Sequence, residues 1–125
     1  MVIDDDPSFL TAVVRLIRMG GYDARGFSTI AGLSSRLPFP ENCCVLADVV
    51  LRGESGLDIP DMLRARGEPA AVVFMSATED RDKIKTASSR GAVPCLKKPI
   101  EATTLFEALE TAFLALRQVS QANDP

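Results

Sequence analysis

Short apolar runs alternate with amphipathic stretches along this chain, and this order repeats five times. Each amphipathic stretch has apolar residues at about every third or fourth position, which is the spacing of one helix face. A repeated strand–helix order requires right-handed crossovers, so we expect an α/β fold with a mostly parallel sheet and helices on both faces. The expected strands are Val2–Ile3, Tyr22–Phe27, Cys43–Ala47, Ala70–Met75 and Val93–Leu96.

The helices between these strands are delimited by glycine, proline and capping residues. Gly20-Gly21 ends the first helix and Pro38 the second. Pro60 is compatible with the third helix because it falls in the first turn. The stretch Val49–Gly56, after the third strand, is expected as a loop. The expected helices begin near Phe9, Ser28, Leu57, Arg81 and Leu105.

Length and composition are those of one globular domain. The chain has 125 residues, of which 46% are apolar and 25% charged, so it can bury a core and is not expected to be disordered. No repeat or linker divides it. We expect residues 1–119 to form the domain and residues 120–125 a polar tail. The net charge of -3, without a basic cluster, argues against direct nucleic-acid binding.

The chain contains no histidine, which excludes several chemistries. Nucleophile systems that use histidine, histidine-containing zinc sites and a phosphohistidine on the domain itself are ruled out. The cysteines Cys43, Cys44 and Cys95 form no CxxC pair and are odd in number, which suits a reducing compartment. With no apolar stretch of about 18 residues and no leader pattern, we expect a cytoplasmic protein without membrane contact.

Polar residues follow four of the five expected strands. Asp4–Asp6 follow the first strand and Asp48 the third. Ser76 follows the fourth strand and Lys98 the fifth. Ligands of parallel sheets gather at the carboxyl ends of the strands, so we expect these side chains to meet at one edge. Each residue alone is weak evidence, and their convergence is the stronger indication of a site.

Carboxylates gathered at one edge need a counter-charge. Repulsion among them would raise a pKa or destabilise the edge, and a divalent cation relieves it. Oxygen ligands from carboxylates, carbonyls and water suit Mg²⁺. A carboxylate in such a site can attack phosphorus and form an aspartyl phosphate, if positive charge and hydrogen-bond donors surround the phosphoryl oxygens. Lys98 and the Ser76 hydroxyl are groups of these types.

Several short segments extend this pattern over nearly the whole chain. They are Val2–Ser8, Val45–Asp48, Ser55–Asp58, Val73–Ala77, Gly91-Ala92 and Leu96–Pro99. In order and spacing they resemble the acidic pair, the phosphoacceptor strand, the Ser/Thr-Ala switch and the Lys-Pro motif of response regulator receiver domains from two-component systems. This resemblance implies a flavodoxin-like (βα)5 fold, doubly wound, with strand order 2-1-3-4-5.

The resemblance also implies a role for each residue at the sheet edge. Asp48 would accept the phosphoryl group, Lys98 would neutralise it, and Ser76 would move to hydrogen-bond it. Pro99 would follow a cis peptide bond. The implied Mg²⁺ ligands are Asp5 directly, Asp4 chiefly through water, Asp48, and Val50 through its backbone carbonyl.

The implied partners follow from the same family. The phosphoryl donor would be a phosphohistidine on a histidine kinase or phosphotransfer domain. The absence of histidine from this chain is consistent with a donor histidine that lies on another protein. An output domain or partner protein would bind the surface formed by the last two helices and the fifth strand. The apolar stripe of the last helix is also compatible with a homodimer formed through this helix. Such a domain is not an enzyme in the usual sense, since it catalyses only its own phosphorylation and dephosphorylation.

Two positions depart from the family pattern. Arg52 stands where the loop after Asp48 usually has a proline, and Cys95 stands at the usually aromatic switch position. A small thiol cannot act as a rotating ring, so an alternative hypothesis is a receiver-fold interaction module without a working switch. A phosphatase that uses an aspartyl phosphate is disfavoured, because Val50 stands where a second acid is needed. A flavin or mononucleotide site is disfavoured because no glycine-rich loop follows the first strand.

Overall fold

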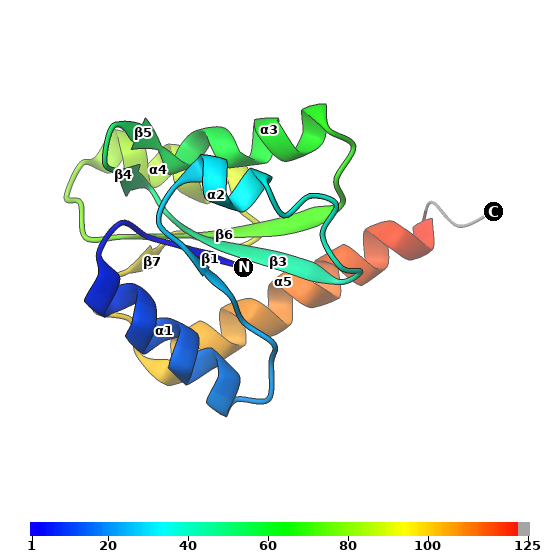
Figure 1. The fold of residues 1–125 in the computed structure, drawn as a ribbon, viewed down its shortest axis with the longest axis horizontal. Coiled ribbons are helices and arrows are strands. Elements are labelled where there is room, and N and C mark those ends of the chain that lie inside the picture. The colour runs from blue at the N-terminus through cyan, green and yellow to red at the C-terminus, as the bar shows by residue number, and fades with distance from the viewer. Residues whose placement is uncertain (123–125) are drawn as a thin grey trace.

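A computed structural model shows a central sheet between two layers of helices (Figure 1). It describes the backbone of residues 1–122 and the side chains of residues 1–118. The strands are β1 (Val2–Ile3), β2 (Gly26–Phe27), β3 (Cys43–Asp48), β4 (Val50–Leu51), β5 (Glu54–Ser55), β6 (Ala70–Ser76) and β7 (Leu96–Lys97). The helices are α1 (Pro7–Met19), α2 (Ile30–Ser34), the 3₁₀ helix η1 (Gly56–Asp58), α3 (Ile59–Ala65), α4 (Arg81–Arg90) and α5 (Ala102–Ala122).

The main sheet has five parallel strands in the order β2-β1-β3-β6-β7. Counted among the strands of this sheet alone, that is the order 2-1-3-4-5, so the predicted flavodoxin-like fold is confirmed. β3 and β6 pair from Cys43 opposite Ala70 to Asp48 opposite Met75. The carboxyl ends of the central strands therefore lie together at one edge of the sheet.

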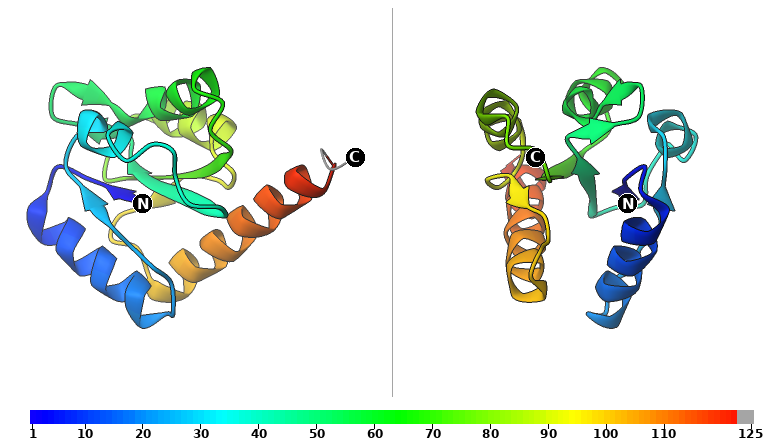
Figure 2. Two further views of the ribbon diagram at one scale, coloured as in Figure 1. Left: turned by 45° about the vertical axis from the view of Figure 1, so that its right-hand side comes forward. Right: turned by 90° about the vertical axis from the view of Figure 1, so that its left-hand side faces the viewer.

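Both faces of the sheet are covered because its strands are apolar on both sides. Val2 and Val73 belong to the cluster under α1 and α5, whereas Ile3 and Val45 belong to the cluster under α2, α3 and α4. The neighbours Val2 and Ile3 point to opposite faces, as the pleat of a strand requires. Figure 2 shows the two helical layers on either side of the sheet.

Two of the predicted strands are shorter than expected. Of Val93–Leu96, only Leu96 lies in β7, because Pro94 has no N–H for a ladder and residues 91–94 bend. Of Tyr22–Phe27, only Gly26–Phe27 pairs with β1, since these are the residues opposite Val2 and Ile3. The sequence pattern marked both strands correctly but could not give their length.

The segment predicted as the loop Val49–Gly56 is ordered instead. β4 and β5 form an antiparallel hairpin closed by Arg52 and Gly53, and η1 follows it. Gly53 has a φ of 73°, a left-handed conformation that glycine adopts without a steric penalty. The second helix also differs from the prediction, because Thr29 rather than Ser28 caps it.

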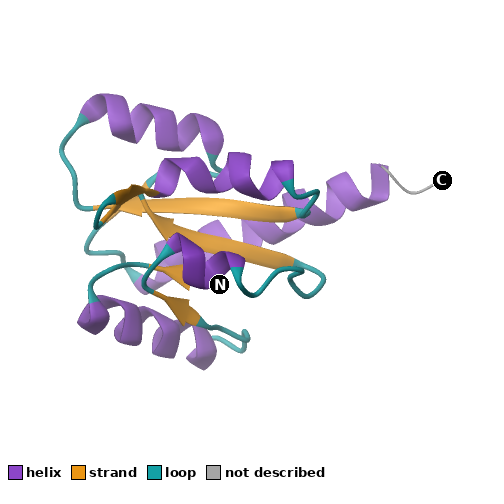
Figure 3. Cartoon of the chain, turned by 45° about the horizontal axis from the view of Figure 1, so that its top comes forward, coloured by secondary structure: helices purple, strands orange, loops and turns teal. Residues whose placement is uncertain are grey.

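Helix α5 runs past the end of the sheet, as Figures 2 and 3 show. It continues to Ala122, so the predicted boundary between a domain of residues 1–119 and a tail of residues 120–125 does not coincide with a helix end. Residues 123–125 lie outside the described part of the chain. Within the described part, no helix is long and apolar enough to cross a membrane.

Candidate functional site

The residues predicted to meet at the carboxyl edge of the sheet do meet there. Asp4, Asp48 and Ser76 stand at the ends of β1, β3 and β6, with exposed fractions of 0%, 7% and 2%. Lys98 directly follows β7. Burial of two carboxylates at one point requires compensation, and the lysine provides part of it.

Lys98 bridges the two buried acids. Its Nζ lies 2.6 Å from Asp4 Oδ2 and 2.7 Å from Asp48 Oδ2. The backbone N–H of Lys98 donates to the carbonyl of Ser76 at 2.9 Å, which fixes this residue to the end of β6. The ring of Phe9 in α1 lies 4.1 Å from Nζ and adds a cation–π contact. The lysine is therefore held from several sides.

Asp4 and Asp6 have different tasks. Asp4 Oδ1 accepts a hydrogen bond from the backbone N–H of Asp6 at 2.8 Å, while Oδ2 faces Lys98. The Asp6 carboxylate points away and accepts from the N–H groups of Ser8 and Phe9, as the N-cap of α1. Asp6 is thus a helix-capping residue, and both oxygens of Asp4 are engaged.

Three carboxylates form a group that could hold a cation. Oxygen atoms of Asp4, Asp5 and Asp48 lie within 4.8 Å of one another. Asp5 is half-buried, and none of the hydrogen bonds among residues 1–118 reaches its carboxylate. Asp5 is therefore the member of the group best able to bind a metal ion directly. An all-oxygen set of this kind fits Mg²⁺.

The hairpin after Asp48 leaves the carbonyl of Val50 outside the ladder. Gly56 N–H donates to the Val49 carbonyl at 3.0 Å, so these residues are a hydrogen-bonded pair, and Val50 opposite Ser55 is a non-hydrogen-bonded pair. The N–H and C=O of Val50 therefore point away from β5. The N–H donates to Asp48 Oδ1 at 3.0 Å, which places the carbonyl on the same side as the acidic group.

The charges in this group shift one another's pKa values. Burial raises the pKa of Asp48, and the negative charge of Asp4 adds to this rise. The hydrogen bonds from Lys98 and from the Val50 N–H oppose the rise, as does the positive charge of the lysine. Burial lowers the pKa of Lys98, but hydrogen bonds to Asp4 and Asp48 and the charges of both acids outweigh it, and the pKa is raised. The lysine stays protonated beside two carboxylates that share its charge.

The predicted switch residues lie next to this group. Ser76 Oγ accepts a hydrogen bond from the backbone N–H of Thr78 at 2.9 Å, so its oxygen is held by the loop that leads to α4. Cys95 is half-buried, and its backbone N–H donates to Ser88 Oγ of α4 at 3.0 Å. The peptide bond between Lys98 and Pro99 is cis.

Two supporting residues, Phe9 and Gly56, are not indicated as such by the sequence. The pattern places Phe9 only at the start of the first helix, although its ring also covers the lysine. A Cβ atom at Gly56 would overlap with the backbone carbonyl of Asp48, so only glycine fits there. The sequence signal for Gly56 was its place in a motif, which gave no hint of the close approach to Asp48.

The fold and the site define a parallel α/β protein with a buried acid–lysine group at the carboxyl edge of its sheet. The family model described as the response regulator receiver domain matches residues 1–110. The chain therefore belongs to the response regulator receiver domain family.

Individual relatives agree with this assignment. The response regulator protein TodT of Pseudomonas putida is 30% identical over 122 residues, which are 97% of this chain and 54% of TodT. The transcriptional regulatory protein FixJ of Bradyrhizobium diazoefficiens is 28% identical over 121 residues, 97% of this chain and 58% of FixJ. The chain thus spans about half the length of these relatives.

Solved structures show the same fold. A response regulator receiver domain protein from Clostridium thermocellum has a TM-score of 0.83 and 25% identity, over 94% of this chain and 95% of that one. Full-length FixJ from B. japonicum has a TM-score of 0.84 and 26% identity, over 96% of this chain and 59% of that one. The beryllofluoride-activated NtrC4 receiver domain dimer, with a TM-score of 0.81 and 18% identity, covers 92% of this chain and 95% of that one and supports the fold alone.

Proposed function

We propose that Asp48 accepts a phosphoryl group from a phosphohistidine on a histidine kinase or phosphotransfer domain. The observation that carries this proposal is the buried Asp48 carboxylate, held between the Lys98 ammonium at 2.7 Å and the Val50 N–H at 3.0 Å, at the edge of a receiver fold. Both donors favour the ionised carboxylate, which is the form that attacks phosphorus.

The transfer conserves atoms and charge without a further reactant. One carboxylate oxygen of Asp48 attacks phosphorus, the phosphorus–nitrogen bond of the donor breaks, and the imidazole leaves with the electron pair. The product is an aspartyl phosphate, a mixed anhydride. Lys98 already lies against Asp48 Oδ2 and neutralises part of the roughly 1.5 to 2 negative charges that a phosphoryl group adds.

Mg²⁺ is the cofactor that this acidic group would hold. Asp5 would bind it directly, together with Asp48 and the Val50 carbonyl. Asp4 would act chiefly through water, because its own oxygens are occupied by the Asp6 N–H and by Lys98. Bound there, the ion would supply positive charge to the phosphoryl oxygens.

Ser76 supports a switch that starts at the phosphoryl group. Its Oγ now accepts from the Thr78 N–H, and a phosphoryl oxygen on Asp48 would offer the Ser76 O–H a charged acceptor, toward which the hydroxyl would turn. Thr78 lies in the loop that leads into α4, so reorientation of Ser76 would shift the start of that helix. The surface of α4, β7 and α5, where an output domain or a second copy would bind, would change with it.

A specific observation favours a second candidate, an interaction module with a weak switch or none. Cys95, directly before β7, has a small thiol at the position that is usually aromatic in the family, and its backbone N–H donates to Ser88 Oγ of α4. In this alternative the fold binds its partner equally well in both states.

Phosphorylation of Asp48 is tested with a radiolabelled small-molecule phosphodonor and Mg²⁺. We expect acid-stable, alkali-labile label on the native chain, none on Asp48→Asn, and full labelling of Asp61→Asn, which removes an exposed acid of α3. Label that survives Asp48→Asn, or no label on the native chain, would refute the proposal.

The switch is tested separately with beryllofluoride and Mg²⁺ in a heteronuclear spectrum. Shifts that reach Cys95 and α5 would establish a working switch. Shifts confined to Asp48 and its neighbours would instead favour the interaction module. Equal affinity for the partner protein with and without beryllofluoride would also favour the interaction module.

A further inference from the structure

A closed series of contacts runs from Asp4 through the first turn of α1 to Lys98 and back to Asp4. Asp4 Oδ1 accepts from the N–H of Asp6 at 2.8 Å, and Asp6 Oδ1 accepts from the N–H of Phe9 at 3.2 Å. The centroid of the Phe9 ring lies 4.1 Å from Lys98 Nζ, which donates to Asp4 Oδ2 at 2.6 Å. The start of α1 therefore fixes the Phe9 ring relative to the lysine and to the acidic group.

Three groups surround the Lys98 ammonium. They are the carboxylates of Asp4 and Asp48, which it bonds at 2.6 and 2.7 Å, and the face of the Phe9 ring. The lysine side chain is only 14% exposed. An aromatic face attracts a cation because the ring carries negative charge there, and the attraction is stronger where water is excluded. The ring is therefore an electrostatic partner of the ammonium as well as an apolar neighbour.

These contacts respond differently to a phosphoryl group on Asp48. The hydrogen bond to Asp48 Oδ2 depends on one oxygen atom, and the ammonium must share or leave that atom to reach the phosphoryl oxygens. The attraction of an aromatic face extends to about 6 Å from the centroid, so Nζ can move by about 2 Å from its present place and keep it. The ring thus retains the lysine while its hydrogen-bond partners change.

We propose that Phe9 is a positioning residue for Lys98, whose ring keeps the ammonium beside Asp48 while the charge of the phosphoryl group develops there. The inference rests on the phosphorylation of Asp48 proposed above and adds a residue of α1 to it. Phe9 acts through the lysine, because a cation that is already in place does not have to be reoriented during the transfer. Without the ring, the ammonium is free to turn toward Asp4 or water, and the transfer becomes slower.

The first test changes the charge of the ring face and keeps its shape. Position 9 is filled in turn by phenylalanine with one, two and three ring fluorines, which withdraw electrons from the face and nearly keep the volume. The initial rate of Asp48 labelling by a radiolabelled small-molecule phosphodonor is measured at saturating Mg²⁺. We expect the rate to fall stepwise with each fluorine, and by about 3–30-fold in Phe9→Leu. Phe9→Tyr, which keeps an electron-rich ring, should stay within about twofold of the native rate.

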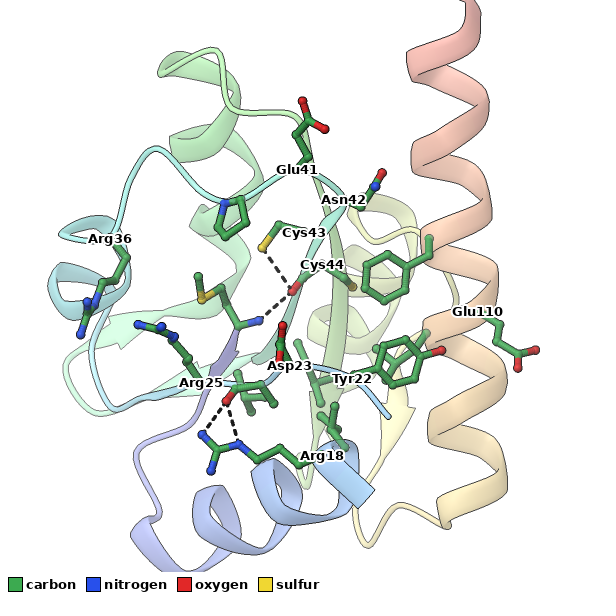
Figure 4. A pocket seen from close by; sticks show the side chains of 18 of the residues that line it. Arg18, Tyr22, Asp23, Arg25, Arg36, Glu41, Asn42, Cys43, Cys44 and Glu110 are labelled. Carbon is green, nitrogen blue, oxygen red and sulfur yellow. Dashed lines mark hydrogen bonds between the residues drawn. The ribbon is translucent and has the colours of Figure 1, made fainter. Parts of the chain in front are cut away.

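Phe106→Leu is the matched control. Phe106 packs against the same core cluster as Phe9, but its ring lies against Gly20 and stacks on Tyr22 at 6.2 Å. Gly20 follows the other end of α1, roughly 16 Å from Phe9 along the helix axis. Tyr22 lines a groove beside α5, at the end of the sheet opposite the acidic group (Figure 4). Both leucine variants lose a half-buried ring and some stability, but Phe106→Leu should label within about twofold of the native rate.

The contact itself is measured without phosphoryl transfer. The ring current of Phe9 shields protons that lie over its face, so it shifts the ammonium protons of Lys98 upfield in a proton–nitrogen spectrum. These signals should move downfield in Phe9→Leu and keep their position in Phe106→Leu. This readout reports the place of the lysine whether or not Asp48 is phosphorylated.

The outcomes separate this inference from the proposed function. No label on the native chain would overturn the phosphorylation of Asp48 and the role of Phe9 together. Equal labelling rates in the native, fluorinated and Phe9→Leu chains would overturn the role of Phe9 alone. A rate that falls in Phe9→Leu but is unaffected by fluorine would also overturn it, since the ring would then only fill space. An unchanged Lys98 signal in Phe9→Leu would remove the contact on which the inference stands.

Discussion

Lys98 Nζ lies 2.7 Å from Asp48 Oδ2, although 50 residues separate them in the sequence. The same Nζ lies 2.6 Å from Asp4 Oδ2, so one ammonium serves two buried carboxylates. A single positive charge cannot fully compensate two negative ones, and the group keeps a net negative charge. That residual charge, beside Asp5, is what makes a site for a divalent cation physically reasonable.

Removing the lysine leaves both carboxylates without a cation. In Lys98→Met we expect the free energy of unfolding to fall by about 3 kcal/mol in the absence of Mg²⁺, because a buried charge without its partner is costly. Added Mg²⁺ should restore part of the loss. Urea unfolding with a chelator and with Mg²⁺ measures both effects. The control is Lys97→Met, an exposed neighbour whose loss should change stability by less than about 0.5 kcal/mol.

Asp5 and Asp6 are adjacent acids with different expected effects on metal binding. Asp5→Asn should weaken Mg²⁺ binding by at least about tenfold, since it removes a charged ligand. Asp6→Asn removes the same charge one residue further on and keeps the cap of α1, because asparagine caps as well as aspartate. Its Mg²⁺ affinity should change by less than about threefold. Calorimetric titration with Mg²⁺ measures the affinity of both variants. Equal losses of Mg²⁺ affinity in the two variants would assign the effect to net charge alone.

The site was predictable because parallel strands bring their carboxyl ends to one edge. Asp4, Asp48 and Ser76 each follow an apolar run, and this alone was enough to bring them together. Lys98, the lysine directly before Pro99 in the Lys-Pro motif, is the residue that reaches the acids.

The supporting contacts were not predictable from local patterns. The hairpin of β4 and β5 has too few residues to show a period, so it was expected as a loop. The contact of Phe9 with Lys98 depends on how α1 packs against the end of β7, and a sequence pattern does not show helix placement. The length of β7 was misjudged because Pro94 limits pairing while the apolar pattern continues.

Gly56 is expected to tolerate no side chain. A Cβ at this position meets the backbone carbonyl of Asp48, so Gly56→Ala must displace either η1 or the end of β3. We expect a loss of about 2–4 kcal/mol in unfolding free energy and weaker labelling of Asp48 by a phosphodonor. Gly53→Ala is the matched control: its Cβ meets nothing within 4 Å, and its φ of 73° costs only about 1 kcal/mol. If both variants lose the same stability, the close approach at Gly56 is not the cause.

Cys44 is expected to make stability fall at alkaline pH. Burial raises the pKa of its thiol from 9.0 to about 12, with the positive amino terminus opposing the rise and Cys43 adding to it. In the unfolded chain the thiol ionises above its ordinary pKa of 9.0, while in the folded chain it stays protonated until about 12. The unfolded state therefore binds fewer protons in this window, and the unfolding free energy drops by on the order of 1 kcal/mol for each pH unit.

Urea unfolding of the native chain and of Cys44→Ala between pH 8 and about pH 10.5 measures this contribution, over a range in which Lys98 remains protonated because its pKa is raised above 10.5. The native chain should lose stability more steeply than Cys44→Ala above pH 9.0, where the unfolded thiol begins to ionise. Parallel slopes for the two proteins would mean that the Cys44 thiol titrates in the folded state as it does in the unfolded chain, and that it is not held in its neutral form by burial.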